Sequence, residues 1–235
     1  MLQTISSFLS EHLSDKKAIG ALNKKWLSYG ALRELKKDVH KALRKNGIAK
    51  QDRVAIVLPN GPTMATAFVT IAQCTTTAPL NPNYREDEFS FYLDDLKAKA
   101  LVVNDGYDGP AAAAAERLDI KIIRLIESDQ VAGLFSLVGD GDKDFIEDEE
   151  VCENDVALIL HTSGTTSRPK IVPLLQSNIA ASASNIAQSL SLSSADRCLN
   201  VMPLFHIHGL IAAVSASLSV GCLLYTSPSP RDNTT

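Results

Sequence analysis

The chain contains 235 residues, of which 45% are hydrophobic and 21% are charged, a composition typical of a folded globular protein and not of a disordered chain. Its formal net charge of −4 gives no electrostatic reason to expect a nucleic acid as a partner. The four cysteines lie far apart, without a Cys-x-x-Cys pair or a nearby histidine at metal-ligand spacing. We therefore expect reduced thiols in an intracellular protein, no metal site and no nucleic-acid partner.

The first half of the chain alternates predicted helices and strands. Ser28 can cap a helix that Gly47 is placed to end. The apolar residues of this helix recur at helical spacing: Leu32, Leu35, Val39 and Leu43. Strands are then predicted at 54–58, 100–103 and 120–126, and helices at 63–73, at 86–97 and from 111 onward. This alternation predicts an α/β fold of layered, mostly parallel sheets covered by helices.

A polar connection follows the last of these strands. Residues 130–154 are rich in Gly, Asp and Glu and are expected to form an exposed link between two subdomains. Within and just after it, residues 140–155 hold nine acidic residues and one basic residue, whereas residues 16–53 hold twelve basic and three acidic ones. Charge runs of this kind are usually solvated surfaces, so we assign them no further role.

The second half contains fewer predicted elements. Ser177 is expected to cap a helix at 178–190, and a strand is expected at 198–202. The most apolar segment, 210–224, has only 15 residues, including three serines and a glycine. A membrane-spanning helix needs about 20 mostly apolar residues, so we expect a buried helix followed by a strand and no membrane span. Residues 225–235 are a polar Pro/Ser-rich tail that resembles non-native read-through and is expected to be disordered.

One stretch has the composition of an anion-binding loop. An apolar run at 156–160 predicts a buried strand, and the sequence HTSGTTSRPK follows it at 161–170. Its hydroxyls, its backbone N–H groups around one glycine and the ammonium of Lys170 suit a phosphate. The loop lacks the second glycine and the Lys-Ser/Thr pair of a Walker A motif, so P-loop NTPase chemistry is not expected.

A pair of histidines forms the second candidate site. His206 and His208 follow the strand at 198–202 within the sequence Pro-Leu-Phe-His-Ile-His-Gly. A metal pair is one interpretation, but no third ligand stands at a recognisable spacing. Satisfied polar residues at the mouth of a core are the simpler alternative.

The order of residues at 161–170 resembles the phosphate-binding signature of the adenylate-forming (AMP-binding) superfamily, which includes acyl-CoA synthetases, oxalate-CoA ligases and 4-coumarate-CoA ligases. Most members have Gly at the position of Ser167, but the oxalate-CoA ligase branch resembles this chain in having Ser there. Ile171 replaces a glycine that members almost always carry. Residues 78–84 resemble the family's Ala-Pro-Leu-Asn-Pro-x-Tyr segment, although 75–77 are three threonines where Gly-Ala is usual. The sequence at 203–209 resembles the next motif of the family.

The resemblance implies an acid–CoA ligase. A carboxylate would attack the α-phosphate of Mg-ATP, and the thiol of coenzyme A would then displace AMP. The residues that would hold the ATP phosphates are Thr162, Ser163, Gly164, Thr165, Thr166 and Lys170. Phe205 and His206 would line the pocket of a small carboxylic acid, with His208 serving only in packing. The implied ligands are therefore ATP, Mg²⁺, coenzyme A and the acid.

The resemblance covers nearly the whole chain but only part of the family's length. Residues 1–224 match the N-terminal portion of the large domain, with a subdomain break near 130–154, and 225–235 remain unmatched. The segment for adenine and magnesium, the ribose-binding Asp and the small C-terminal domain with its lysine are not found, so the catalytic residues stay unknown. We therefore expect the chain alone to be nearly inactive, because loss of one donor to a developing charge already costs about 10²–10³ in rate.

Two other functions fit the same loop. A non-catalytic module that binds nucleotide phosphates would bind ATP without forming a thioester, and an adenylation domain would pass its acyl group to a carrier protein. The family includes cytoplasmic and peroxisomal enzymes, so either compartment is compatible with the intracellular assignment.

Overall fold

The computed structural model describes residues 3–144, 150–162 and 169–226, which form two sheets. The larger sheet has seven strands, in the order β7-β6-β5-β3-β4-β8-β9. Their bounds are β3 (Arg53–Val57), β4 (Thr76–Pro79), β5 (Ala100–Asn104), β6 (Lys121–Glu127), β7 (Phe135–Val138), β8 (Val156–Thr162) and β9 (Lys170–Leu175). The smaller sheet, in the order β10-β11-β1-β2, contains β1 (Lys17–Gly20), β2 (Leu27–Ser28), β10 (Arg197–Asn200) and β11 (Leu223–Thr226).

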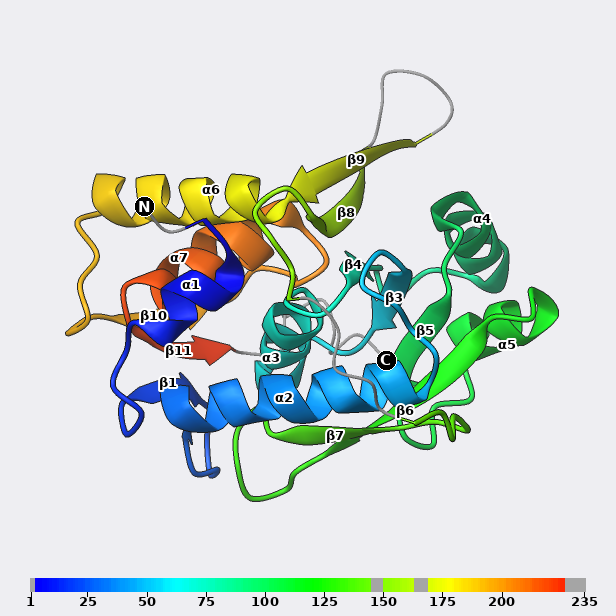
Figure 1. The fold of residues 1–235 in the computed structure, drawn as a ribbon, viewed down its shortest axis with the longest axis horizontal. Coiled ribbons are helices and arrows are strands. Elements are labelled where there is room, and N and C mark those ends of the chain that lie inside the picture. Colours follow the sequence, from blue (N-terminus) through cyan, green and yellow to red (C-terminus); the bar gives the residue numbers. More distant parts are fainter. Residues whose placement is uncertain (1–2, 145–149, 163–168, 227–235) are drawn as a thin grey trace.

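Helices cover these sheets (Figure 1). They are α1 (Ile5–Ser10), α2 (Tyr29–Lys45), α3 (Pro62–Ile71), α4 (Glu86–Leu96), α5 (Pro110–Arg117), α6 (Gln176–Ser189), the π-helix η1 (His208–Ser215) and α7 (Ala216–Ser219). Within the described residues, no helix combines the length and the apolar character needed to cross a membrane.

The larger sheet is buried on both faces, which explains its continuous apolar strands. Strands β6, β5, β3, β4 and β8 run parallel, and the edge strands β7 and β9 are antiparallel to their neighbours. Because side chains alternate along a strand, Val54 and Ile56 of β3 face the core shared with α2 and α3, whereas Ala55 and Val57 face the core shared with α4 and α5. The predicted α/β fold with helices on both faces is confirmed.

The predicted first helix is confirmed as α2. The Ser28 hydroxyl accepts a hydrogen bond from the backbone N–H of Ala31 at 3.1 Å, and the four apolar residues predicted to share one face are all buried. Gly47 follows the helix with φ of +76°, a left-handed conformation that favours glycine.

Two other expectations need correction. Helix α6 begins at Gln176 and not after Ser177, because the side chain of Asn178 accepts the backbone N–H of Leu175 at 2.9 Å and Gln176 is already buried in the helix. The connection 130–154 contains a strand, β7, which pairs with β6 and buries Phe135. Its short apolar run was too weak a signal beside the surrounding Gly and Asp residues.

The charge runs also prove to be in contact. Lys36 of α2 lies 3.3 Å from Glu150, and Lys50 lies 3.1 Å from Asp155. The expectation that these charges are only solvated is therefore wrong at these positions, where two described acidic residues pair with lysines in or just after α2.

The smaller sheet joins the beginning of the chain to its far end. Strand β1 pairs with β11, and β11 pairs in turn with β10. Because β11 extends through Thr226, the described fold includes the first two residues of the segment that we expected to be a tail. Residues 227–235 lie outside the described residues.

Gln176 is expected to hold three helices together. Its side chain is fully buried, accepts the N–H of Ile5 at 3.2 Å and donates to the carbonyl of Ala72 at 2.5 Å. Substitution Gln176→Leu leaves both backbone groups without this partner and is expected to lower the free energy of unfolding by about 2–4 kcal/mol. Urea denaturation followed by circular dichroism measures it. Gln188→Leu, on the exposed side of the same helix, serves as the control, and an equal loss in the two variants contradicts the role.

Asp155 is expected to make stability depend on pH. Burial alone would raise the pKa of its carboxyl, but hydrogen bonds from the Cys152 N–H at 2.7 Å and from Lys50 outweigh it and hold the pKa below its usual value. A lowered pKa in the folded state stabilises the fold at neutral pH, and this contribution disappears as the pH falls. Asp155→Asn should therefore lower unfolding stability at pH 7, and the difference from the parent should shrink below about pH 4. The exposed Asp108→Asn variant should show no such pH-dependent difference.

Candidate functional site

The predicted phosphate loop begins at the carboxyl end of β8, which lies beside β4 in the parallel part of the sheet. Thr77 pairs with Leu158 in the ladder, and the hydroxyls of Thr76 and Thr77 each donate to a carbonyl of β8 at 2.8 Å. Thr76 and Thr77, two of the three threonines that depart from the family pattern, therefore bind β8 to β4. In open α/β sheets, ligands bind in the crevice outside the carboxyl ends of the parallel strands.

The two described ends of this loop face each other across the β8–β9 hairpin (Figure 1). Thr162 is the ladder partner of Lys170, and both side chains are exposed. Ser163, Gly164, Thr165 and Thr166 lie outside the described residues. Ile171, which replaces the usual glycine, is a half-buried strand residue opposite His161 and packs against the core on the α4 side. The hydroxyl and the ammonium at the ends of the loop suit a phosphate ligand.

The residue just before the loop is anchored to α4. The Nε2 atom of His161 lies 3.0 Å from the carboxylate of Asp95, and its ring meets the ring of Tyr92 edge-on at 4.7 Å. Tyr92 in turn stacks on Tyr84 at 4.8 Å, and burial together with their hydrogen bond raises the pKa of Tyr84. Only 7% of the His161 side chain is exposed, compared with 40% of that of Asp95. The start of the loop is thus fixed by a buried ring and a carboxylate at the protein surface.

The second motif lies over the carboxyl ends of β3 and β4. The backbone N–H of Leu204 donates to the side chain of Asn60 at 2.9 Å. Phe205 lines a crevice whose other walls come from the residues that follow the two strands: Leu58, Asn60, Leu80 and Pro82, with Met64 and Leu204. The crevice holds only about 10 Å³, so it is a packed contact and not a ligand-sized cavity.

His206 and His208 are both exposed. The ring of His206 lies 4.9 Å from that of Phe205, next to the crevice. His208 starts η1, and its exposure makes the prediction of a packing role wrong. Gly209 is buried where a Cβ would lie 2.5 Å from the carbonyl oxygen of Pro203, so the turn requires glycine. Among the described residues, no group of three side chains is arranged to hold a metal ion.

Both motifs therefore reach the same edge of the large sheet, one at the end of β8 and the other over β3 and β4. The described contacts do not join Lys170 to His206, so a common cleft for ATP and acid stays a prediction. Three contacts were missed from sequence: Asp95 with His161, Asn60 with Leu204, and the threonine bonds to β8. The sequence Pro-Asn-Gly at 59–61 is a strong turn signal, but nothing in it indicates what the side chain of Asn60 binds.

Comparison with known proteins agrees with this architecture. The sequence matches the family "AMP-binding enzyme" over residues 9–235. It is 36% identical over 225 residues to an oxalate–CoA ligase of Arabidopsis thaliana, covering 93% of this chain and 44% of the relative. It is 38% identical over 191 residues to the oxalate–CoA ligase of Saccharomyces cerevisiae, covering 71% of this chain and 35% of that protein.

Solved structures show the same fold. The apo MatB structure from Rhodopseudomonas palustris superimposes with a TM-score of 0.80 at 23% identity, over 97% of this chain and 46% of that one. The chain thus spans less than half the length of these relatives. The match over nearly all its residues nevertheless places this chain in the family of AMP-binding enzymes.

Proposed function

We propose that this chain forms the N-terminal part of an acid–CoA ligase and supplies its ATP phosphate site. The observation that carries the proposal is the pairing of Thr162 with Lys170 across the hairpin at the carboxyl end of β8. This pairing puts a hydroxyl and a cation at the two ends of a hydroxyl-rich loop, on the edge of the sheet where ligands bind. The curated relatives named as oxalate–CoA ligases support the same assignment.

In this proposal the loop stabilises the pyrophosphate leaving group. A substrate carboxylate attacks the α-phosphate of ATP, forming an acyl-adenylate and releasing pyrophosphate; the thiol of coenzyme A then attacks the acyl carbon and releases AMP. Lys170, with hydroxyl and N–H groups from Thr162 to Thr166, neutralises negative charge that grows on the β- and γ-phosphates. When bound together with ATP, Mg²⁺ would neutralise negative charge on the phosphates, and the exposed hydroxyl of Thr162 would offer it an oxygen ligand.

The acid is proposed to bind beside the second motif. Phe205 is held over the ends of β3 and β4, and His206 projects next to it where it can meet a carboxylate. The identities to oxalate–CoA ligases favour a small acid of that kind over a phenylpropanoid acid such as 4-coumarate, whose tobacco ligase is 28% identical. A ligase that uses ATP and coenzyme A would act inside the cell, in the cytoplasm or the peroxisome, without a nucleic-acid partner.

Lys170 is expected to determine phosphate affinity. Lys170→Ala removes one charge-assisted hydrogen bond to the ligand and should weaken binding of ATP and pyrophosphate to the 235-residue chain by about tenfold. Isothermal titration calorimetry measures it, with the exposed Lys99→Ala variant as the matched control. Equal affinities for the parent and Lys170→Ala would show that the loop does not hold the phosphates.

The ligase reaction itself needs a separate measurement in a longer protein that carries this chain. We expect oxalate-dependent exchange of pyrophosphate into ATP, and a loss of about 10²–10³ in its rate in Lys170→Ala. ATP binding without exchange for any acid would reject the ligase and leave a phosphate-binding module.

Asp95 is expected to act on ATP binding through His161. Asp95→Asn weakens the contact that orients the ring before the loop and should lower ATP affinity about threefold, or about 0.6 kcal/mol, within the range of one net hydrogen bond. The neighbouring Asp94→Asn, which breaks only a surface pair with Lys97 at 3.0 Å, is the control. Calorimetry and thermal unfolding are compared in both variants. A change in melting temperature without a change in affinity would make Asp95 purely structural.

A further inference from the structure

A charged pocket lies along α2, apart from the candidate site described above. It encloses about 460 Å³, within the size range of small-molecule sites of roughly 300–1,000 Å³. Its walls come from α1, α2, the two residues 73–74 shortly after α3, and residues 150–151. None of the residues proposed for the ATP or acid sites lines it. It is therefore a separate site and does not depend on the proposed ligase function.

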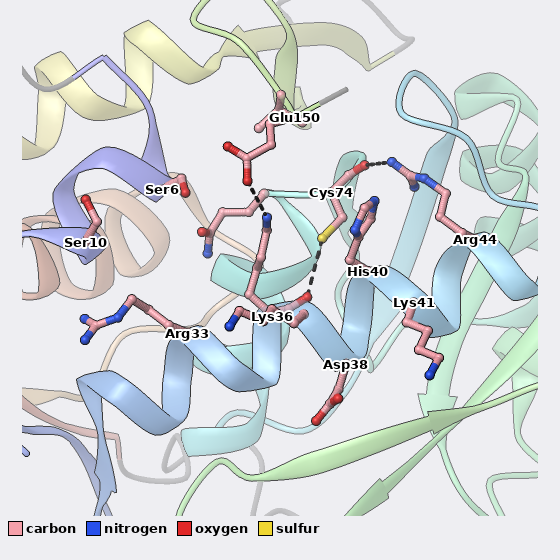
Figure 2. Close-up of a pocket in the computed structure, with 13 residues that line it drawn as sticks. Ser6, Ser10, Arg33, Lys36, Asp38, His40, Lys41, Arg44, Cys74 and Glu150 are labelled. Atoms are coloured by element: carbon pink, nitrogen blue, oxygen red, sulfur yellow. Dashed lines mark hydrogen bonds and ion pairs between the residues drawn. The ribbon is translucent and has the colours of Figure 1, made fainter. Parts of the chain in front are cut away.

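The pocket is strongly cationic because of helical spacing. Residues 33, 36, 37, 40, 41 and 44 recur every three or four positions along α2 and all border it, including five lysines and arginines against the carboxylates of Asp38 and Glu150. Figure 2 shows Lys36 and His40 directed to the side of α2 where Cys74 and Glu150 lie, whereas Asp38 points to the other side. The interior thus combines a lysine ammonium and an imidazole, with the hydroxyl of Ser6 nearby. The hydroxyl of Ser10 also lines the pocket but donates to the carbonyl of Ser7 at 2.8 Å.

The two arginines at the ends of the pocket are structural. Arg33 donates to the carbonyls of Leu9 and His12 at 3.0 and 3.1 Å, which fixes the end of α1 to α2. Arg44 donates to the carbonyl of Cys74 at 2.9 Å, which fixes the end of α3. The walls of the pocket are therefore preorganised, a condition that lowers the entropic cost of binding a ligand.

Lys36 is the cation whose partner a ligand can replace. Its side chain is only 17% exposed, and its Nζ atom lies 3.3 Å from Glu150, whose side chain is 80% exposed. A buried cation gains more from a tightly held anion than from a carboxylate that is largely solvated and free to return to water. The contact between Lys36 and the Glu150 carboxylate thus shows that this position accepts an anion.

We propose that the α2 pocket binds a small anion bearing phosphate groups, with Lys36 as its main cationic ligand and Glu150 as an internal competitor that the ligand displaces. A phosphate group carries more negative charge and more acceptor oxygens than the Glu150 carboxylate that it replaces at Lys36. Serine hydroxyls and a lysine ammonium are the donors that recur in phosphate sites.

The test is an NMR titration of the ¹⁵N-labelled 235-residue chain with inorganic pyrophosphate. The amide signals of Ser6, Ser10, Lys36 and His40 should shift and saturate, and they should do so equally in the Lys170→Ala variant. Signals of Thr162 and Lys170 report on the proposed ATP site separately, so failure of one site is distinguishable from failure of the other.

Two variants with matched controls decide the role of the pocket. Lys36→Met keeps the aliphatic stem packed and should weaken the affinity at the pocket about tenfold, whereas Glu150→Gln should tighten it about two- to fivefold. Lys99→Ala and Glu116→Gln make the same charge changes at exposed positions elsewhere and should leave it unchanged. If pocket signals do not shift, or if the controls change the affinity as much as the pocket variants do, the proposal is wrong.

Discussion

The burial of the parallel sheet on both faces is the constraint on which the remaining structure depends. Strands β3, β5 and β8 have no polar face, so their side chains supply two cores and leave only the strand ends for chemistry. All five parallel strands point the same way, and the segments that follow β3, β4 and β8 therefore meet at one edge. The two motifs of the sequence lie there because the strands themselves are buried, whereas the segments that follow their carboxyl ends reach the surface.

At this edge, each motif is positioned by residues distant in sequence. His161 is held by Asp95 and Tyr92 of α4, and Leu204 is held by Asn60, 144 residues earlier in the chain. Asp95 does so from helix α4, and Asn60 does so from the turn between β3 and α3. In the proposed site, such support would hold the start of each loop before a ligand arrives and so lower the entropic cost of binding.

The elements with strong periodicity could be predicted from sequence. Helix α2, with its Ser28 cap, and the central strands were found because one local signal determines each of them. The pairing of Lys36 with Glu150 and of Lys50 with Asp155 could not be found, because a charge run looks the same whether it faces water or another run. The start of α6 was misplaced for a similar reason. Ser177 is a favourable cap locally, but Gln176 is buried and bonded to Ile5 and Ala72, and the helix begins there, two residues earlier than expected.

The substitution of Ile for the usual glycine at position 171 has a consequence for how the hairpin adapts to its ligand. Ile171 packs against the core and pairs with His161 in the ladder immediately after Lys170. The main chain there therefore lacks the conformational freedom that a glycine would give. In the proposed reaction, Lys170 would then follow the leaving pyrophosphate only by rotation about the bonds of its own side chain. The ammonium of Lys170 is therefore mobile only through its side chain, because its main chain is held in the β8–β9 ladder.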